Sequence, residues 1–280
     1  MPPILSLVVL LLAACDSGPN RPEGSDLSLT VAVGDTTRTA RVRVPDALSS
    51  GAPAHLLIAL HGSQDSGPNF QRGSRIDEVG TDDLIIAYPT AAKGNWAEGC
   101  DCNVADRLQI DDLGFMGALI DSIGARYNVA PERTYAMGYS QGGLFAYRLA
   151  CHMGDAFAAV AAVSAPMSVP LSHNCNPGEA TSVLTLHGAL DRVLPWGGTS
   201  AGSLSLLSAP NTAGFWAEEF DCAPSRQENL RSGDATLRAV RWESCRDGAR
   251  VSLYEMPDGA HTWYTKSPDS RRLFLEFFGL

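Results

Sequence analysis

The 280-residue chain is 45% hydrophobic and 19% charged, a composition typical of a globular protein and long enough for one large α/β domain. Its formal net charge of −10 and the lack of any lysine- or arginine-rich run argue against a nucleic-acid-binding protein.

The N-terminus has the pattern of a targeting segment. Residues 4–14 are apolar apart from one serine, a length that suits a signal peptide better than a membrane-spanning helix. Leu12-Ala13-Ala14-Cys15 resembles a bacterial lipoprotein signal, although Met1-Pro2-Pro3 lacks the usual positive charge. An ordinary cleaved signal with an incidental cysteine is the alternative.

From this pattern we predict three parts: a lipoprotein-type signal peptide at 1–14, a flexible tether at 15–26 and a single domain at 27–280. The tether is rich in Asp, Ser, Gly, Pro and Asn, which is typical of flexible linkers. We therefore expect an exported protein. It would be lipid-anchored through Cys15 at the bacterial cell envelope, or secreted, and would contact a membrane only through that anchor.

The cysteine count fits an exported protein. The chain has seven cysteines, and lipidation of Cys15 would leave an even number for disulfides. Cys222 and Cys245 are the favoured pair, because they bracket two strand-like runs, Arg226–Leu230 and Thr236–Trp242. The bond would close the base of that hairpin.

The remaining cysteines give weaker predictions. Cys151 and Cys175 are a second candidate pair. Cys100 and Cys102 are so close that they would pair with each other only in a strained loop. They also lack the second close pair expected of a zinc site, so we expect no metal and no cofactor.

The middle of the chain alternates strand-like and helix-like segments. Leu27–Val33 and Thr39–Val44 alternate apolar and polar residues around a turn, which predicts an antiparallel hairpin at a sheet edge. The almost entirely apolar run His55–Leu60 is typical of a strand covered on both faces of a parallel sheet. Similar runs predict strands at 84–88, 134–137, 158–163, 182–186 and 251–256.

Helical signals lie between these strands. Apolar residues recur at helical spacing between Leu113 and Tyr127, a second helix should follow residue 140, and a closing helix should follow Pro268. Strands that alternate with helices predict an α/β fold with a mainly parallel central sheet and helices on both faces. No second domain is visible.

Gly138-Tyr139-Ser140-Gln141-Gly142 lies between a strand-like and a helix-like run, the arrangement of a nucleophile elbow. In such a turn the serine has a strained backbone, and the flanking glycines let strand and helix approach closely. The turn also places the hydroxyl at a helix N-terminus, where free N–H groups can meet a developing oxyanion. The motif therefore predicts a nucleophilic Ser140.

A nucleophilic serine needs a base, and the base needs an orienting acid. In α/β-hydrolases these follow the serine in the order acid, then histidine, on loops after later strands. Asp191 follows the predicted strand at 182–186, and His261 follows the strand at 251–256. Asp258 is the rival acid, but it is only three residues from the histidine. We expect His187 to pack beneath the Asp191 loop.

The oxyanion hole should use two backbone N–H groups. One belongs to Gln141, the residue after the serine. The other belongs to the loop after the strand at 55–60, where His61-Gly62-Ser63 lies. Ser63 is the favoured donor and Gln64 the alternative.

These motifs together resemble the secreted polyhydroxybutyrate depolymerase and feruloyl esterase family, related to acetylxylan-type carbohydrate esterases. They occur in order across roughly residues 50–280: Ala59-Leu60-His61-Gly62, Ile110–Phe115, Gly138–Gly143, Tyr147–Cys151, Leu186-His187-Gly188 with Asp191, and Gly259–Trp263. The chain departs from the family pattern in having Ser63 where a cysteine is usual and Tyr264 where a proline is usual.

The resemblance implies an α/β-hydrolase without a large lid domain. Such a protein would cleave carboxylic esters with the triad Ser140, Asp191 and His261. The expected substrate is a small or oligomeric ester: a feruloyl or acetyl ester, or a hydroxyalkanoate oligomer. A peptidase, a thioesterase or a non-catalytic binding protein on a hydrolase scaffold are the alternatives.

Aromatic residues near the predicted triad are candidates for the substrate cleft. Trp263 directly follows the base and Trp196 follows the acid loop, while Tyr139 and Trp96 are further candidates. Aromatic walls suit a feruloyl ring, a sugar face or a polyester chain. They do not discriminate among these substrates.

Overall fold

The structure is a computed structural model, and it describes residues 23–200 and 204–280. The predicted signal peptide, Cys15 and most of the predicted tether lie outside the described residues. The first strand begins at Gly24, so the prediction that the tether extends to residue 26 is wrong at its end. Gly24, Ser25 and Asp26 pair with the second strand, because its backbone offers them hydrogen-bonding partners.

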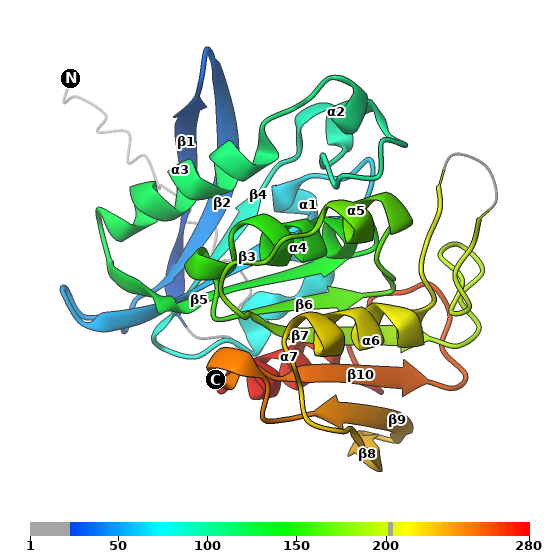
Figure 1. The fold of residues 1–280 in the computed structure, drawn as a ribbon. Helices are drawn as coiled ribbons and strands as arrows, with labels where there is room; N and C mark the ends of the chain where they lie inside the picture. Colours follow the sequence, from blue (N-terminus) through cyan, green and yellow to red (C-terminus); the bar gives the residue numbers. More distant parts are fainter. Residues whose placement is uncertain (1–22, 201–203) are drawn as a thin grey trace, which may run out of the picture.

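One ten-stranded sheet runs through the molecule in the order β1-β2-β4-β3-β5-β6-β7-β10-β9-β8 (Figure 1). Its middle strands, from β4 to β10, are all parallel, and an antiparallel hairpin flanks them at each edge. This confirms the predicted parallel sheet and both hairpins. The strands are β1 (Gly24–Val33), β2 (Thr36–Pro45), β3 (Pro53–Leu60), β4 (Leu84–Pro89), β5 (Asn128–Tyr139), β6 (Ala159–Val163), β7 (Ser182–Gly188), β8 (Arg226–Ser232), β9 (Ala235–Trp242) and β10 (Val251–Met256).

Helices cover both faces of this sheet, as predicted. In Figure 1, α3, α4 and α6 lie in front of it, whereas α1 and α7 lie behind. Only the short α5 is found between β6 and β7, so no lid domain is inserted there. The helices are α1 (Gly67–Ser74), α2 (Val104–Arg107), α3 (Asp112–Gly124), α4 (Gln141–His152), α5 (Val169–Asn174), α6 (Ala209–Glu219) and α7 (Ser270–Phe278).

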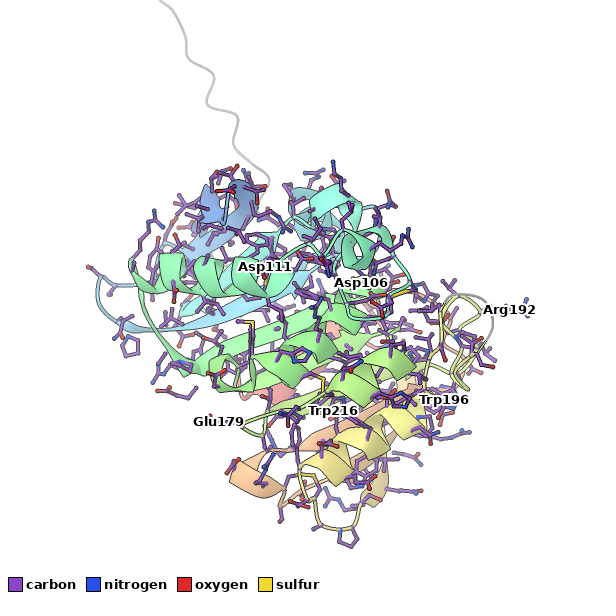
Figure 2. All side chains as sticks on the ribbon, turned by 45° about the horizontal axis from the view of Figure 1, so that its top comes forward. Asp106, Asp111, Glu179, Arg192, Trp196 and Trp216 are labelled. Atoms are coloured by element: carbon purple, nitrogen blue, oxygen red, sulfur yellow. A yellow bond between two sulfur atoms is a disulfide. The ribbon has the colours of Figure 1, made fainter. Side chains whose placement is uncertain are left out.

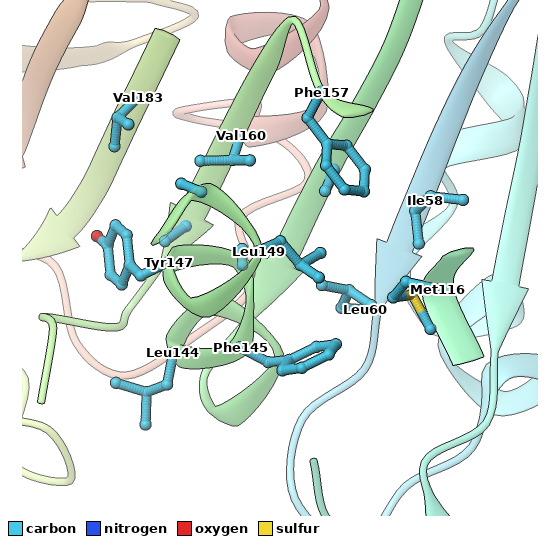
Figure 3. Packing of buried hydrophobic residues seen from close by; sticks show 14 of the residues in the cluster. Ile58, Leu60, Met116, Leu144, Phe145, Tyr147, Leu149, Phe157, Val160 and Val183 are labelled. Atoms are coloured by element: carbon cyan, nitrogen blue, oxygen red, sulfur yellow. The ribbon is translucent and has the colours of Figure 1, made fainter. Parts of the chain in front are cut away.

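The position of β3 between two hydrophobic cores explains why the run that ends at Leu60 is apolar. Leu56, Ile58 and Leu60 belong to the core beneath α3 and α4, whereas Leu57 and Ala59 belong to the core beneath α1 and α7. Alternate side chains of a strand point to opposite faces, so both faces of β3 need apolar residues. Figure 3 shows Ile58 and Leu60 in the first of these cores.

Three disulfides link the loops. Cys222–Cys245 and Cys151–Cys175 are bonded as predicted, and Cys100–Cys102 are also bonded to each other. Within residues 23–200 and 204–280, no helix combines the length and the apolar composition needed to span a bilayer.

Candidate active site

Ser140 lies at a sharp turn between β5 and α4. Its backbone has φ 53° and ψ −121°, a strained conformation for a residue with a side chain. A Cβ atom on Gly138 would lie 2.1 Å from the carbonyl oxygen of Gly142, and one on Gly142 would lie 2.3 Å from that of Leu60. Both glycines therefore permit the close approach of strand and helix, as the motif predicted.

The structure brings Ser140, His261 and Asp191 together. His261 Nε2 lies 3.0 Å from Ser140 Oγ, and His261 Nδ1 lies 2.8 Å from Asp191 Oδ2. A carboxylate only accepts hydrogen bonds, so Nδ1 carries the proton and Nε2 is free to accept the serine proton. The three side chains have the geometry of a Ser–His–Asp triad.

Asp191 is held by the loop that follows β7. Its side chain is fully buried, and its Oδ1 atom accepts hydrogen bonds from the backbone N–H groups of Val193 and Leu194 at 2.8 and 2.9 Å. Burial of a carboxylate is tolerated when such partners satisfy it. Asp258, the rival acid, is exposed, and the structure does not pair it with His261.

A second histidine supports this carboxylate. His187 is fully buried, as expected for a residue beneath the acid loop. Its Nε2 lies 2.9 Å from the Leu194 carbonyl oxygen and 3.5 Å from Asp191 Oδ2. Burial lowers the pKa of His187, so the ring stays neutral and its Nε2–H points at both acceptors.

The two predicted donors, the backbone N–H groups of Gln141 and Ser63, have no hydrogen-bond acceptor among the described residues. Gln141 begins α4, so its N–H has no intrahelical partner. No hydrogen bond from the Ser63 N–H to another described residue is present either. The N–H of Gln64, the alternative donor, is bonded to the Gly94 carbonyl at 2.7 Å, so Ser63 is the better candidate.

The prediction that Trp96 lines the cleft is wrong. Its side chain is fully buried and stacks on Phe145 with ring centroids 5.1 Å apart. Its indole N–H donates to the His61 carbonyl oxygen at 2.9 Å. Trp96 therefore supports the loop after β3 from below.

The other aromatic candidates lie near the triad and are partly exposed. The ring of Tyr139 lies 5.3 Å from that of His261, and Trp263 lies edge-on to Tyr139 at 6.3 Å. Figure 2 shows Trp196 near Arg192 in the loop after β7, and the ring of Trp196 is 5.9 Å from that of His187. Substrate contact by these three side chains stays a prediction.

One cluster has the residue types of a metal site. Glu98, Cys100 and Cys102 place ligand atoms within 4.8 Å of one another. The two sulfur atoms are joined in a disulfide, and metals bind the thiolate form of cysteine. In this state the cluster lacks thiolate ligands, and the triad needs no metal to bring its three groups together.

Fold and site together define an α/β-hydrolase with a serine-centred triad. A model of the Esterase family, described as "Putative esterase", matches residues 32–254. The chain belongs to that family.

Named relatives agree with this assignment. The chain is 25% identical over 236 residues to feruloyl esterase B of Piromyces equi, covering 80% of this chain but only 42% of that protein. It is 27% identical over 231 residues to "Probable feruloyl esterase C" of Aspergillus niger, covering 80% of this chain and 76% of the relative. The resemblance to feruloyl esterases is confirmed.

Solved structures share the fold. The acetyl xylan esterase from Aspergillus awamori superposes with a TM-score of 0.59 at 15% identity, over 91% of this chain and 99% of that one. At this identity the match shows the α/β-hydrolase fold alone.

Proposed function

We propose that this protein is an exported serine esterase that cleaves feruloyl or acetyl esters, or hydroxyalkanoate oligomers, through an acyl-enzyme. The observation that carries the proposal is the pair of contacts from His261 to Ser140 and Asp191 at a strained elbow. This arrangement suits acyl transfer, because a base lies within reach of a nucleophile and an acid orients the base.

The first half-reaction forms the acyl-enzyme. Ser140 Oγ attacks the ester carbonyl carbon while its proton passes to His261 Nε2. Asp191 keeps the imidazole in the required tautomer and stabilises its positive charge. The oxyanion of the tetrahedral intermediate accepts hydrogen bonds from the Ser63 and Gln141 N–H groups. Loss of one such donor would cost on the order of 3 kcal/mol.

Collapse of this tetrahedral intermediate completes the first half-reaction: its bond to the alcohol oxygen breaks, His261 gives its proton to that oxygen, and the acyl-enzyme remains. The second half-reaction releases the acid. A water molecule then enters, loses a proton to His261 Nε2 and attacks the acyl carbon. When this second intermediate collapses, the proton returns to Ser140 and the carboxylic acid leaves.

The substrate class rests on the relatives and on the aromatic side chains near the triad. The two relatives are named as feruloyl esterases, and Tyr139 lies beside His261. An aromatic side chain there would pack against a feruloyl ring or a sugar face. Trp263 and Trp196 are further proposed contacts.

Export is supported by the disulfides, whereas the anchor rests on the Leu12-Ala13-Ala14-Cys15 sequence. Disulfides persist mainly in oxidising compartments, and the structure contains three. We place the protein in the periplasm, at the cell surface or outside the cell, with Cys15 as the lipid attachment site when the signal is of the lipoprotein type.

Parallel kinetics on methyl ferulate, acetylated xylan and soluble hydroxybutyrate oligomers test the proposal. We expect a clear preference, in kcat/KM, for one of these esters over p-nitrophenyl acetate. Faster turnover of an acyl thioester or a peptide than of all three esters would contradict it. Failure of a fluorophosphonate probe to label Ser140 would indicate a binding protein.

A further inference from the structure

Hydrogen bonds fix both ring nitrogens of His61, the residue directly after β3. The side chain is fully buried. Its Nε2 atom accepts the Ala91 N–H at 3.0 Å, and its Nδ1 atom lies 2.7 Å from the Gly62 carbonyl oxygen. A ring nitrogen that accepts an N–H carries no proton, so the ring is neutral and its one proton is on Nδ1. His61 therefore donates a hydrogen bond to the Gly62 carbonyl.

The Gly62 carbonyl belongs to the same peptide unit as the Ser63 N–H, the second donor of the proposed oxyanion hole. This peptide bond is trans, and a trans peptide unit is planar, so its carbonyl and its N–H point in opposite directions. The hydrogen bond from His61 thus fixes the direction of the Ser63 N–H. It also draws electron density toward the carbonyl oxygen, which makes the N–H of the same unit a stronger donor.

This peptide unit lies beside the nucleophile. A Cβ atom on Gly62 would be 3.6 Å from Ser140 Cβ and 3.3 Å from Tyr139 Cδ1. The Ser63 N–H has no hydrogen-bond acceptor among the described residues. It is therefore available to an oxyanion that forms at Ser140.

The backbone on either side of this unit is held as well. The Trp96 indole N–H donates to the His61 carbonyl oxygen at 2.9 Å, and the rings of Trp96 and His61 lie 5.0 Å apart. The Gln64 N–H donates to the Gly94 carbonyl oxygen at 2.7 Å. These contacts fix the ends of the loop, whereas the His61 side chain holds the Gly62–Ser63 unit itself.

A charged His61 could not hold the unit in this way. Protonation of Nε2 would change it from an acceptor into a donor and break its contact with the Ala91 N–H. Burial lowers the pKa of His61, although the Gly62 carbonyl and the Asp65 charge act in the opposite direction. The ring is therefore neutral near pH 7.

Resting on the proposed function, we propose that His61 is a positioning residue for ester hydrolysis: its Nδ1–H holds and polarises the Gly62–Ser63 peptide unit, so that the Ser63 N–H is preorganised for the oxyanion. The buried side chain acts only through the peptide unit that follows it. Preorganised donors are effective because they need no reorganisation while charge develops. A loosened Ser63 N–H should therefore slow catalysis even though the donor is still present.

Two amide substitutions separate the donor of His61 from its acceptor. In His61→Asn the amide nitrogen takes the place of Nδ1 and can still donate to Gly62, whereas in His61→Gln the amide oxygen takes the place of Nε2 and can still accept from Ala91. We expect His61→Gln to lower kcat for p-nitrophenyl acetate about tenfold to a hundredfold, because the Ser63 N–H is loosened but not lost. His61→Asn should stay within about fivefold of wild type, because the donor remains. KM should change by less than about threefold in both, because both half-reactions use the same oxyanion hole.

His55→Gln is the matched control. His55 lies near the start of β3, at the other end of the strand from His61, and its Nδ1 atom is 3.3 Å from the Tyr135 hydroxyl. The kcat of this variant should stay within about twofold of wild type. Rates are expressed per active site titrated with a fluorophosphonate, so that misfolded protein does not contribute.

The tautomer of His61 can also be measured on the unaltered protein. With isotopically labelled histidine, NMR gives separate signals for the two ring nitrogens, and the chemical shift of each shows whether it carries a proton. We expect the proton on Nδ1, because Nε2 accepts the Ala91 N–H.

Three results would overturn the inference. One is a His61→Gln kcat equal to that of His55→Gln, and another is an equal loss of kcat in His61→Asn and His61→Gln. The third, which decides the matter where neither variant folds, is an NMR spectrum with the proton of His61 on Nε2 or on both nitrogens. If the wild-type chain hydrolyses the ester and Ser140→Ala does not, these results reject only this inference. A wild-type chain without turnover rejects both it and the proposed function.

Discussion

His261 Nε2 lies 3.0 Å from Ser140 Oγ, although 121 positions separate the two residues in the chain. The contact arises because β5 and β10 run parallel in one sheet, so the segments that follow them meet at the same edge. Asp191 reaches the same edge from the end of β7. The sheet topology therefore brings the three side chains together.

Replacement of Asp191 by Asn tests the tautomer argument. An amide can donate a hydrogen bond to Nδ1, which would leave the proton on Nε2 and block proton transfer from Ser140. We expect kcat to fall on the order of a thousandfold or more, as in other serine hydrolases with this change. The melting temperature is measured in parallel to show that the variant is folded.

The control for this variant is Asp258→Asn. Asp258 is exposed and only three residues from His261. Its replacement therefore removes one negative charge from the same region, as Asp191→Asn does, but breaks no hydrogen bond to His261. Its kcat/KM should stay within about twofold of wild type, as for surface changes in general. Equal losses in the two variants would assign the orienting role to the wrong carboxylate.

Substitution of Gly142 by Ala tests the close approach at the elbow. The new Cβ atom would lie 2.3 Å from the Leu60 carbonyl oxygen, so backbone must shift. We expect a loss of stability of about 1–3 kcal/mol and at least a tenfold loss of kcat, measured by urea unfolding and by ester hydrolysis.

Gly214→Ala is the matched control. Gly214 lies in α6 and a Cβ atom there would meet nothing within 4 Å. Alanine should stabilise that helix by about 0.5–1 kcal/mol and leave kcat unchanged. A Gly142→Ala variant that behaves like Gly214→Ala would show that the elbow does not need the glycine.

The stability of the protein should depend on Glu98 in a defined pH range. Burial, with a smaller effect from the Asp106 charge, raises the pKa of Glu98 well above its ordinary value of 4.5. Between pH 4.5 and this raised pKa the folded state binds more protons than the unfolded state, so stability falls as pH rises. Glu98→Gln removes the part of this dependence that Glu98 contributes, while the carboxyl groups of Asp106 and Asp112, whose pKa values burial also raises, keep theirs.

Melting temperatures of wild type and Glu98→Gln, measured from pH 4.5 to pH 9, check this argument. The variant should gain stability relative to wild type as the pH rises above 4.5, and the difference should be smallest at the acid end. A difference that is constant over the whole range would show that Glu98 titrates normally.

The sequence predicted the parallel strands and the triad because their signals are local. His55–Leu60 is apolar along its length since it faces two cores, and a run of this kind is visible without a structure. The elbow is likewise predictable, because all of its pattern lies within the five residues Gly138–Gly142. Asp191 and His261 then follow from their places after later strands.

Other features depend on contacts between distant residues. Trp96 lies in a segment with no regular pattern, so nothing in the sequence distinguishes a cleft aromatic from one buried beneath the His61 loop. The helix α6 was missed although Ser208 and Pro210 give a start signal, with Ser208 capping the Asn211 N–H.

The central claim is that Ser140 forms the acyl-enzyme, and intact-protein mass spectrometry combined with p-nitrophenyl acetate kinetics tests it most directly. With a fluorophosphonate, the wild-type protein should gain one phosphonyl group at Ser140, and Ser140→Ala should gain none and lose at least a thousandfold in kcat. A Ser140→Ala variant with wild-type turnover, or a probe bound at another residue, would contradict the account.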